Sequence, residues 1–118
     1  MSVSPSFKTF VLDQLARRIP SIRARSMFGG VGIYAADLFF ALIAEDTLYF
    51  KVDESNRPDF EARNMGPFRP FGDDGEVMQY YCVPEDLLDD PEALWEWAGK
   101  AIAVARRARD RARGHPRS

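Results

Sequence analysis

The chain has 118 residues, of which 46% are hydrophobic and 29% are charged. This balance is typical of a single soluble globular domain and excludes a chain that is disordered throughout. No apolar run reaches the roughly 18 residues that a membrane-spanning helix needs, and the first residues lack the profile of a signal peptide. We therefore expect a cytoplasmic protein that does not enter a membrane.

The formal net charge of −2 conceals an uneven distribution. Residues 106–118 hold six arginines and one aspartate, a balance of +5, so residues 1–105 carry −7. We therefore divide the chain into a domain over residues 1–105 and a basic helix end and tail over residues 106–118. Opposite charges on the two parts can attract different partners or each other.

A helix is predicted near the N-terminus. Ser4 is a suitable N-cap and Pro5 fits the first turn; apolar residues then recur at three- and four-residue spacing until a proline ends the pattern. In residues 22–27, which follow, Arg23 and Arg25 share one face of a weak alternation. This segment is predicted to be either a short edge strand or an extended lead-in.

The central strands are predicted over residues 29–35 and 38–44. The first strand carries Gly30 and Gly32 on one face, and glycine inside a strand is usual where a bulge forms or where a backbone or ligand approaches closely. The second strand is apolar on both faces, although the outer face of a two-layer domain is expected to be polar. Either a helix or loop covers this second face, or a partner subunit does.

The second half of the chain completes the predicted fold. Residues 47–52 alternate as a third antiparallel strand, a short helix follows, and residues 68–71 and 76–83 flank a Gly-Asp-Asp-Gly turn that predicts a hairpin. The last helix begins at Pro91 and has an apolar stripe. The order α-β-β-β-α-β-β-α predicts a two-layer α+β domain, in which helices pack on one face of a five-stranded antiparallel sheet.

Several short motifs follow one another along the chain: Met27-Phe28-Gly29-Gly30-x-Gly32-Ile33-Tyr34, Phe40-Ala41-Leu42-Ile43, Leu48-Tyr49-Phe50-Lys51-x-Asp53, Met78-x-Tyr80-Tyr81 and Asp89-Asp90-Pro91-Glu92-Ala93-Leu94. Over roughly residues 5–105 this order resembles the N-terminal domain of the TfoX (Sxy) family of competence regulators. The family motif falls on Met27, Phe28, Gly29, Gly30, Gly32 and Tyr34.

The resemblance has implications for both fold and function. It implies the same two-layer order of elements, similar to the secretion-chaperone-like architecture. Full-length members of the family couple this domain to a C-terminal helical domain and act as positive regulators of DNA-uptake genes. The resemblance therefore implies a role in transcription regulation, but the role of the helical domain does not carry over to this chain.

The residues provide no set for catalysis, metal binding or cofactor binding. Gly30 and Gly32 lack the third glycine and the following helix of a phosphate-binding loop. The single histidine, His115, lies in the tail, and Cys82 has neither a second thiol nor a neighbouring base. We therefore expect a non-enzymatic protein without metal or cofactor.

Two surfaces are candidates for binding. The first is an interface with a protein partner or with a second copy of the chain in a homodimer; its predicted residues are Leu38, Phe39, Ala41, Ile43, Tyr49 and Tyr80. The second is a weak, sequence-independent contact between nucleic acid and arginines spread around the last helix, namely Arg106, Arg107, Arg109, Arg111 and Arg113. The alternative is that these arginines interact favourably with the macrodipole at the C-terminal end of the helix and bind no nucleic acid.

We predict a regulatory interaction module that binds a protein partner or itself. The alternatives are an accessory, sequence-nonspecific DNA-binding protein that acts through the arginines, and a small-molecule sensor with a ligand over Gly30 and Gly32.

Overall fold

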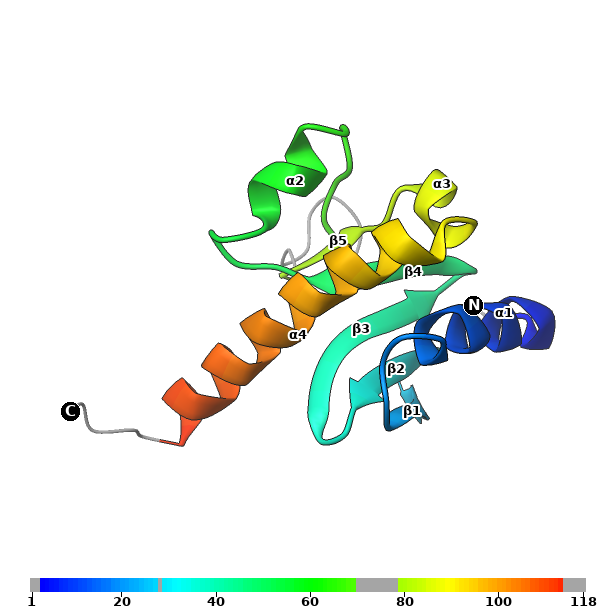
Figure 1. Cartoon of the computed structure of the whole chain (residues 1–118), viewed down its shortest axis with the longest axis horizontal. Helices are drawn as coiled ribbons and strands as arrows, with labels where there is room; N and C mark the ends of the chain where they lie inside the picture. The colour runs from blue at the N-terminus through cyan, green and yellow to red at the C-terminus, as the bar shows by residue number, and fades with distance from the viewer. Residues whose placement is uncertain (1–2, 28, 70–78, 114–118) are drawn as a thin grey trace.

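The computed structural model describes residues 3–27, 29–69 and 79–113 (Figure 1). Its helices and strands are, in chain order, α1 Pro5–Ala16, β1 Ile22–Met27, β2 Gly30–Ala35, β3 Leu38–Ala44, β4 Thr47–Lys51, α2 Arg57–Glu61, β5 Tyr80–Cys82, α3 Glu85–Leu88 and α4 Pro91–Ala112. The five strands of the described part form one antiparallel sheet in the order β1-β2-β3-β4-β5. The predicted α+β class with a five-stranded antiparallel sheet is therefore confirmed.

Two details of the strand prediction are now decided by the structure. Residues 22–27 form an edge strand, β1, and not an extended lead-in. Of the strand predicted over residues 68–71, the described residues 68–69 form none: Pro67 makes a single bridge to Tyr81, and the Phe68 amide donates to the Tyr80 carbonyl (2.7 Å). Proline has no N–H to donate to a strand ladder, which limits pairing at this position. The Gly-Asp-Asp-Gly turn lies outside the described residues.

Each long helix begins where the sequence predicts. At α1 the Phe7 amide donates to the Ser4 hydroxyl (3.3 Å), and Pro5 occupies the first turn. At α4 the Ala93 amide donates to the Asp90 carboxylate (3.2 Å). These caps satisfy amides that have no partner within the helix. From this start α4 continues without a break to Ala112, across the boundary predicted at residue 105.

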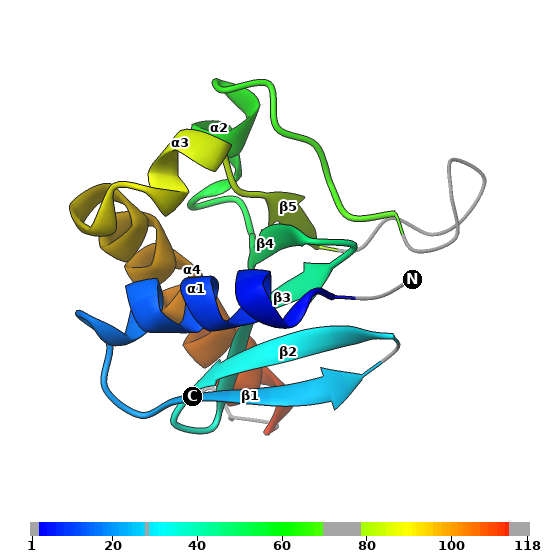
Figure 2. The ribbon, with the colours of Figure 1, turned by 90° about the vertical axis from the view of Figure 1, so that its right-hand side faces the viewer.

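The hydrophobic core lies between the sheet and the helices. The helix α4 crosses β3 and β4, and α1 packs against β1 and α4 (Figures 1 and 2). The core contains fully buried side chains from both layers, among them Val11, Leu15, Ile33, Phe40, Ile43, Phe50, Phe60, Leu94, Ala98 and Ala101. The alanines of α4 let the helix backbone come close to the strands.

A β-bulge in the β2–β3 pair changes the side-chain alternation of β3. Ile33 pairs with Ala41, but the next residue, Tyr34, pairs with Phe39, so Phe40 is the extra residue. Two residues of one strand then oppose one residue of the other. As a result Phe40 and Ala41 are consecutive and both are fully buried in the core.

Close packing of the sheet explains both glycines of β2. A Cβ atom on Gly30 would lie 2.4 Å from the carbonyl oxygen of Ile43 in β3. A Cβ atom on Gly32 would lie 2.7 Å from the methyl carbon of Met27 and 3.1 Å from the ring of Phe39. Gly30 therefore permits a close approach between two backbones, whereas Gly32 leaves room for two side chains.

This difference predicts the effect of a methyl group at Gly30. We expect Gly30→Ala to lower the free energy of unfolding by about 1–3 kcal/mol, because the Ile43 carbonyl belongs to a central strand and cannot move freely. The measurement is urea unfolding followed by circular dichroism. In the matched control, Gly99→Ala, the new methyl meets no atom within 4 Å and should raise the free energy of unfolding by up to about 1 kcal/mol, since alanine favours helices. Equal effects of the two substitutions would contradict this account.

Candidate functional site

The face of the sheet that points away from the helices carries half of the predicted interface residues. We call it the outer face, and the strand registers place Arg23, Arg25, Met27, Tyr34, Phe39, Leu42, Tyr49, Lys51 and Tyr80 on it. Leu42 and Tyr80 are buried, but neither belongs to the core cluster between sheet and helices. The outer face is therefore a second, smaller apolar layer.

Three aromatic rings form a row across the outer face, and we call Tyr34, Phe39 and Tyr80 the aromatic row. The ring centroids of Tyr34 and Phe39 are 5.1 Å apart, and those of Phe39 and Tyr80 are 5.5 Å apart. A cation lies at each end: the Arg23 guanidinium is 5.7 Å from the Tyr34 ring centroid, and the Lys51 Nζ atom is 5.0 Å from the Tyr80 ring centroid. Both distances are within the range of cation–π attraction.

The contacts within the aromatic row determine what it can bind. Because Phe39 contacts both tyrosines and a cation lies over each outer ring, the ring faces already have partners. A nucleic-acid base needs a free ring face on which to stack. Burial, followed by the neighbouring Tyr34, raises the pKa of the Tyr80 phenol. The row is therefore an uncharged surface with a positive charge at each end.

The predicted interface residues fall on two different sides of the sheet. Phe39 and Tyr49 are half-buried on the outer face, and Tyr80 is buried there. Leu38, Ala41 and Ile43 instead belong to the core and are at most 5% exposed, so their assignment to an interface is wrong. The physical reason is the bulge at Phe40, which places residues on both sides of it in the core.

The family motif forms the β1–β2 hairpin beside this surface. Gly29 has a φ of 76°, which glycine adopts without strain. The Met27 side chain and the Phe39 ring lie over Gly32, in the space that a ligand above that glycine would need. Phe28 lies outside the described residues. The motif therefore shapes the sheet, and the structure gives no support to a ligand directly over Gly32.

The arginines of α4 are divided between two environments. Arg107 donates to the Asp53 carboxylate (2.9 Å) and to the Ser55 hydroxyl (2.8 Å), and Arg109 pairs with Asp37 (3.3 Å). Arg106, Arg111 and Arg113 are exposed and form no ion pair with other described residues. The acidic part of the chain and the basic helix end therefore attract each other, which leaves fewer cations for nucleic acid.

Asp53 holds the end of α4 against the turn that follows β4. Its carboxylate accepts hydrogen bonds from the Ser55 amide, the Ser55 hydroxyl and Arg107. Burial raises the pKa of Asp53, but these hydrogen bonds outweigh that effect and lower the pKa to about 2. Asp53 is therefore ionised under all ordinary conditions, and the turn and the helix are joined by a charged hydrogen bond.

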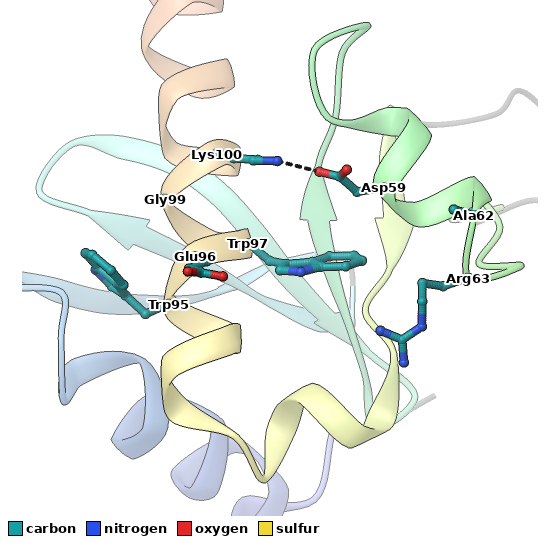
Figure 3. A pocket seen from close by; sticks show the side chains of 8 residues that line it. All are labelled: Asp59, Ala62, Arg63, Trp95, Glu96, Trp97, Gly99 and Lys100. Carbon is teal, nitrogen blue, oxygen red and sulfur yellow. Dashed lines mark hydrogen bonds and ion pairs between the residues drawn. The ribbon is translucent and has the colours of Figure 1, made fainter.

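A separate hollow of about 650 Å³ lies between α2 and α4 (Figure 3). Trp97 points from α4 toward α2 and packs edge-on against Phe60, with ring centroids 4.7 Å apart. Lys100 and Asp59 form an ion pair (2.8 Å) across the hollow, whereas Trp95 points away and is 42% exposed. Among the described residues that line it there is no serine, cysteine or histidine, so they do not form a serine–histidine or cysteine–histidine pair.

Residues 3–27, 29–69 and 79–113 give little support to metal binding, to a membrane-spanning helix or to a reactive cysteine. They contain no group of three or more metal-ligating side chains that could hold a metal ion. Within the same residues, no helix is long and apolar enough to cross a membrane. Burial, followed by the charge of Glu85, raises the pKa of the Cys82 thiol, which makes it a poor nucleophile.

Comparison with known proteins identifies the family. The sequence model of the TfoX N-terminal domain matches residues 13–105, which include all five strands. The chain belongs to the TfoX N-terminal domain family. The resemblance found in the motifs is thereby confirmed, and membership of the TfoX N-terminal family supports a regulatory role related to competence. A search of curated proteins finds no match to the chain.

The lowered pKa of Asp53 predicts a specific dependence of stability on pH. An aspartate ordinarily has a pKa of 3.8, and in the folded protein the value is about 2, so the unfolded chain takes up a proton first as the pH falls. The stability that Asp53 contributes is present above about pH 4 and is lost toward pH 2. We expect Asp53→Asn to cost about 1 kcal/mol at neutral pH, because the half-exposed Arg107 limits the gain.

The measurement is the free energy of unfolding of wild type and Asp53→Asn at several pH values. The difference between them should shrink as the pH falls from about 4 toward about 2. Glu54→Gln removes a neighbouring charge from the same turn and serves as the matched control. If both substitutions give the same dependence on pH, the hydrogen bonds of Asp53 do not cause the effect.

Proposed function

We propose that this domain is a non-enzymatic regulatory module whose outer face and β1 edge bind an acidic, extended segment of another protein. The observation that carries the proposal is the aromatic row with a cation at each end, next to a strand edge that has no partner strand among the described residues. Membership of the TfoX N-terminal domain family supports the regulatory part. The partner and its chemistry are inferred from the surface.

The strand β1 provides an open edge for a partner. Within the described part of the chain β1 pairs only with β2, and it lies at the border of the sheet (Figure 2). The opposite border differs, because Pro67 and Phe68 lie along β5 and bond to it. An open edge offers backbone hydrogen bonds to an added strand, and the side chains beside it provide specificity.

The charges along β1 favour an acidic partner over a second copy of the chain. Arg23 and Arg25 are exposed on β1, and Arg23 also donates to the Ala36 carbonyl (3.0 Å). If two β1 strands paired antiparallel about a two-fold axis, arginines would face arginines, and like charges opposite each other destabilise a strand pair. Carboxylates on the added strand would instead be attracted to both arginines.

The alternatives have weaker support. Accessory nucleic-acid binding would have to compete with the ion pairs of Arg107 and Arg109 and with the contacts that occupy the ring faces of the aromatic row. A ligand over Gly32 would have to displace Met27 and Phe39. An interaction with protein needs neither change.

The proposal predicts which substitutions abolish partner binding. The partner is captured from native extract, purified and titrated against each variant, and binding is mapped by hydrogen exchange. We expect Arg25→Glu and Phe39→Ala each to weaken binding about tenfold or more, because one reverses a charge at the edge and the other interrupts the aromatic row. Amides of β1 should become protected on binding.

Two substitutions on the helix side are the matched controls. Arg106→Glu reverses an exposed charge on α4, and Trp95→Ala removes an exposed aromatic side chain from the same helix. Both should leave the affinity unchanged. Protection confined to α2 and α4 would overturn the proposal, and so would elution of the purified chain as a dimer whose contacts occupy β1.

A further inference from the structure

A groove of about 570 Å³ lies beyond the end of β4, between the following turn and the last turns of α4. Its apolar lining comes from Val52, Val104 and Ala108, of which the two valines are at most 2% exposed. Four cationic side chains also line it: Lys51, Arg57, Arg107 and Arg111. This is a concentration of positive charge on a chain whose formal net charge is −2.

The carboxylates in the groove do not balance these cations. Among the described residues, Asp53 and Glu54 are the acidic ones that line it. Asp53 already accepts hydrogen bonds from Arg107 and Ser55. Its negative charge is therefore compensated within the fold. Four cations and two carboxylates leave a local excess of two positive charges.

Lys51, Arg57 and Arg111 carry this excess; of the three, Arg57 donates a hydrogen bond to the uncharged Gln79 side chain (3.4 Å). Burial, followed by the charge of Arg111, lowers the pKa of Lys51. Arg111 forms no ion pair with the other described residues. Two like charges that face one groove without an anion repel each other, and an anion between them would convert repulsion into attraction.

The groove is built from parts that are held in place. Asn56 is 1% exposed; its side-chain oxygen accepts from the Asp53 amide (2.8 Å), and its side-chain nitrogen donates to the Lys51 carbonyl (3.0 Å). These bonds fix the turn between Lys51, the last residue of β4, and Arg57, the first residue of α2. Arg107 then ties α4 to the same turn through Asp53. The backbone that carries the cations is therefore held in place, which lowers the entropic cost of binding a ligand between them.

We propose that this groove binds a phosphate-bearing small molecule, with the phosphate between Lys51 and Arg111 and the less polar body against Ala108. A phosphate carries up to two negative charges, which matches the excess. Arginine suits phosphate because its guanidinium can donate two parallel hydrogen bonds. The groove shares Lys51 with the aromatic row but uses none of the β1 residues, so a failure of phosphate binding would leave the proposed partner surface standing.

The test is calorimetric titration of the full chain with inorganic phosphate, pyrophosphate and a nucleoside monophosphate at low salt. We expect saturable binding with one site per chain. Lys51→Met and Arg111→Gln should each weaken it about tenfold, the usual effect of losing a charge-assisted hydrogen bond. Arg106→Gln removes a neighbouring arginine that does not line the groove and should leave the affinity unchanged.

Further measurements distinguish the possible causes of a change. Lys51→Arg keeps the charge and should retain most of the affinity, while circular dichroism checks that every variant is folded. A short single-stranded oligonucleotide that competes with pyrophosphate, and loses affinity in the same variants, would support the site and identify backbone phosphate as the source. Absence of saturable binding, or equal losses in Arg106→Gln and Arg111→Gln, would overturn the proposal.

Discussion

One extra residue in β3 determines which side chains of the sheet meet the helices and which face outward. Because side chains alternate along a strand, a shift of one position exchanges the two faces. With Phe40 inserted, Leu38, Phe40, Ala41 and Ile43 all lie in the core. Phe39 is left on the outer face, where it contacts both Tyr34 and Tyr80. Without the bulge the aromatic row would lose its central ring.

The sequence predicts most of the fold because its elements carry local signals. Ser4 and Asp90 have the chemistry of helix caps, and Leu48 and Phe50 alternate as strand residues do. The bulge has no such local signal, because a strand that is apolar on both faces has the same pattern with or without an extra residue. The predicted interface was partly wrong for this reason. The cations at the ends of the aromatic row were also missed, because the pairing of Lys51 with Tyr80 depends on strand register.

Ion pairs join the acidic domain to the basic end of α4. The last turns of α4 are held to the domain by Arg107 and Arg109, which reach carboxylates more than 50 residues away in sequence. These ion pairs depend on tertiary structure, so the net charges of the two parts do not show which residues form them. The sequence correctly showed that the two parts could attract each other, but it could not show which arginines are used within the fold and which remain exposed.

Lys51 belongs to two places at once, because its ammonium lies over the Tyr80 ring and also lines the groove at the end of β4. A single ammonium cannot serve both environments fully. If each is occupied, the two binding equilibria are linked: a ligand in the groove changes the affinity of the sheet surface for its partner, and the partner changes the affinity of the groove for its ligand by the same factor. One flexible side chain would then connect the surface of the sheet to the last helix without any movement of the backbone.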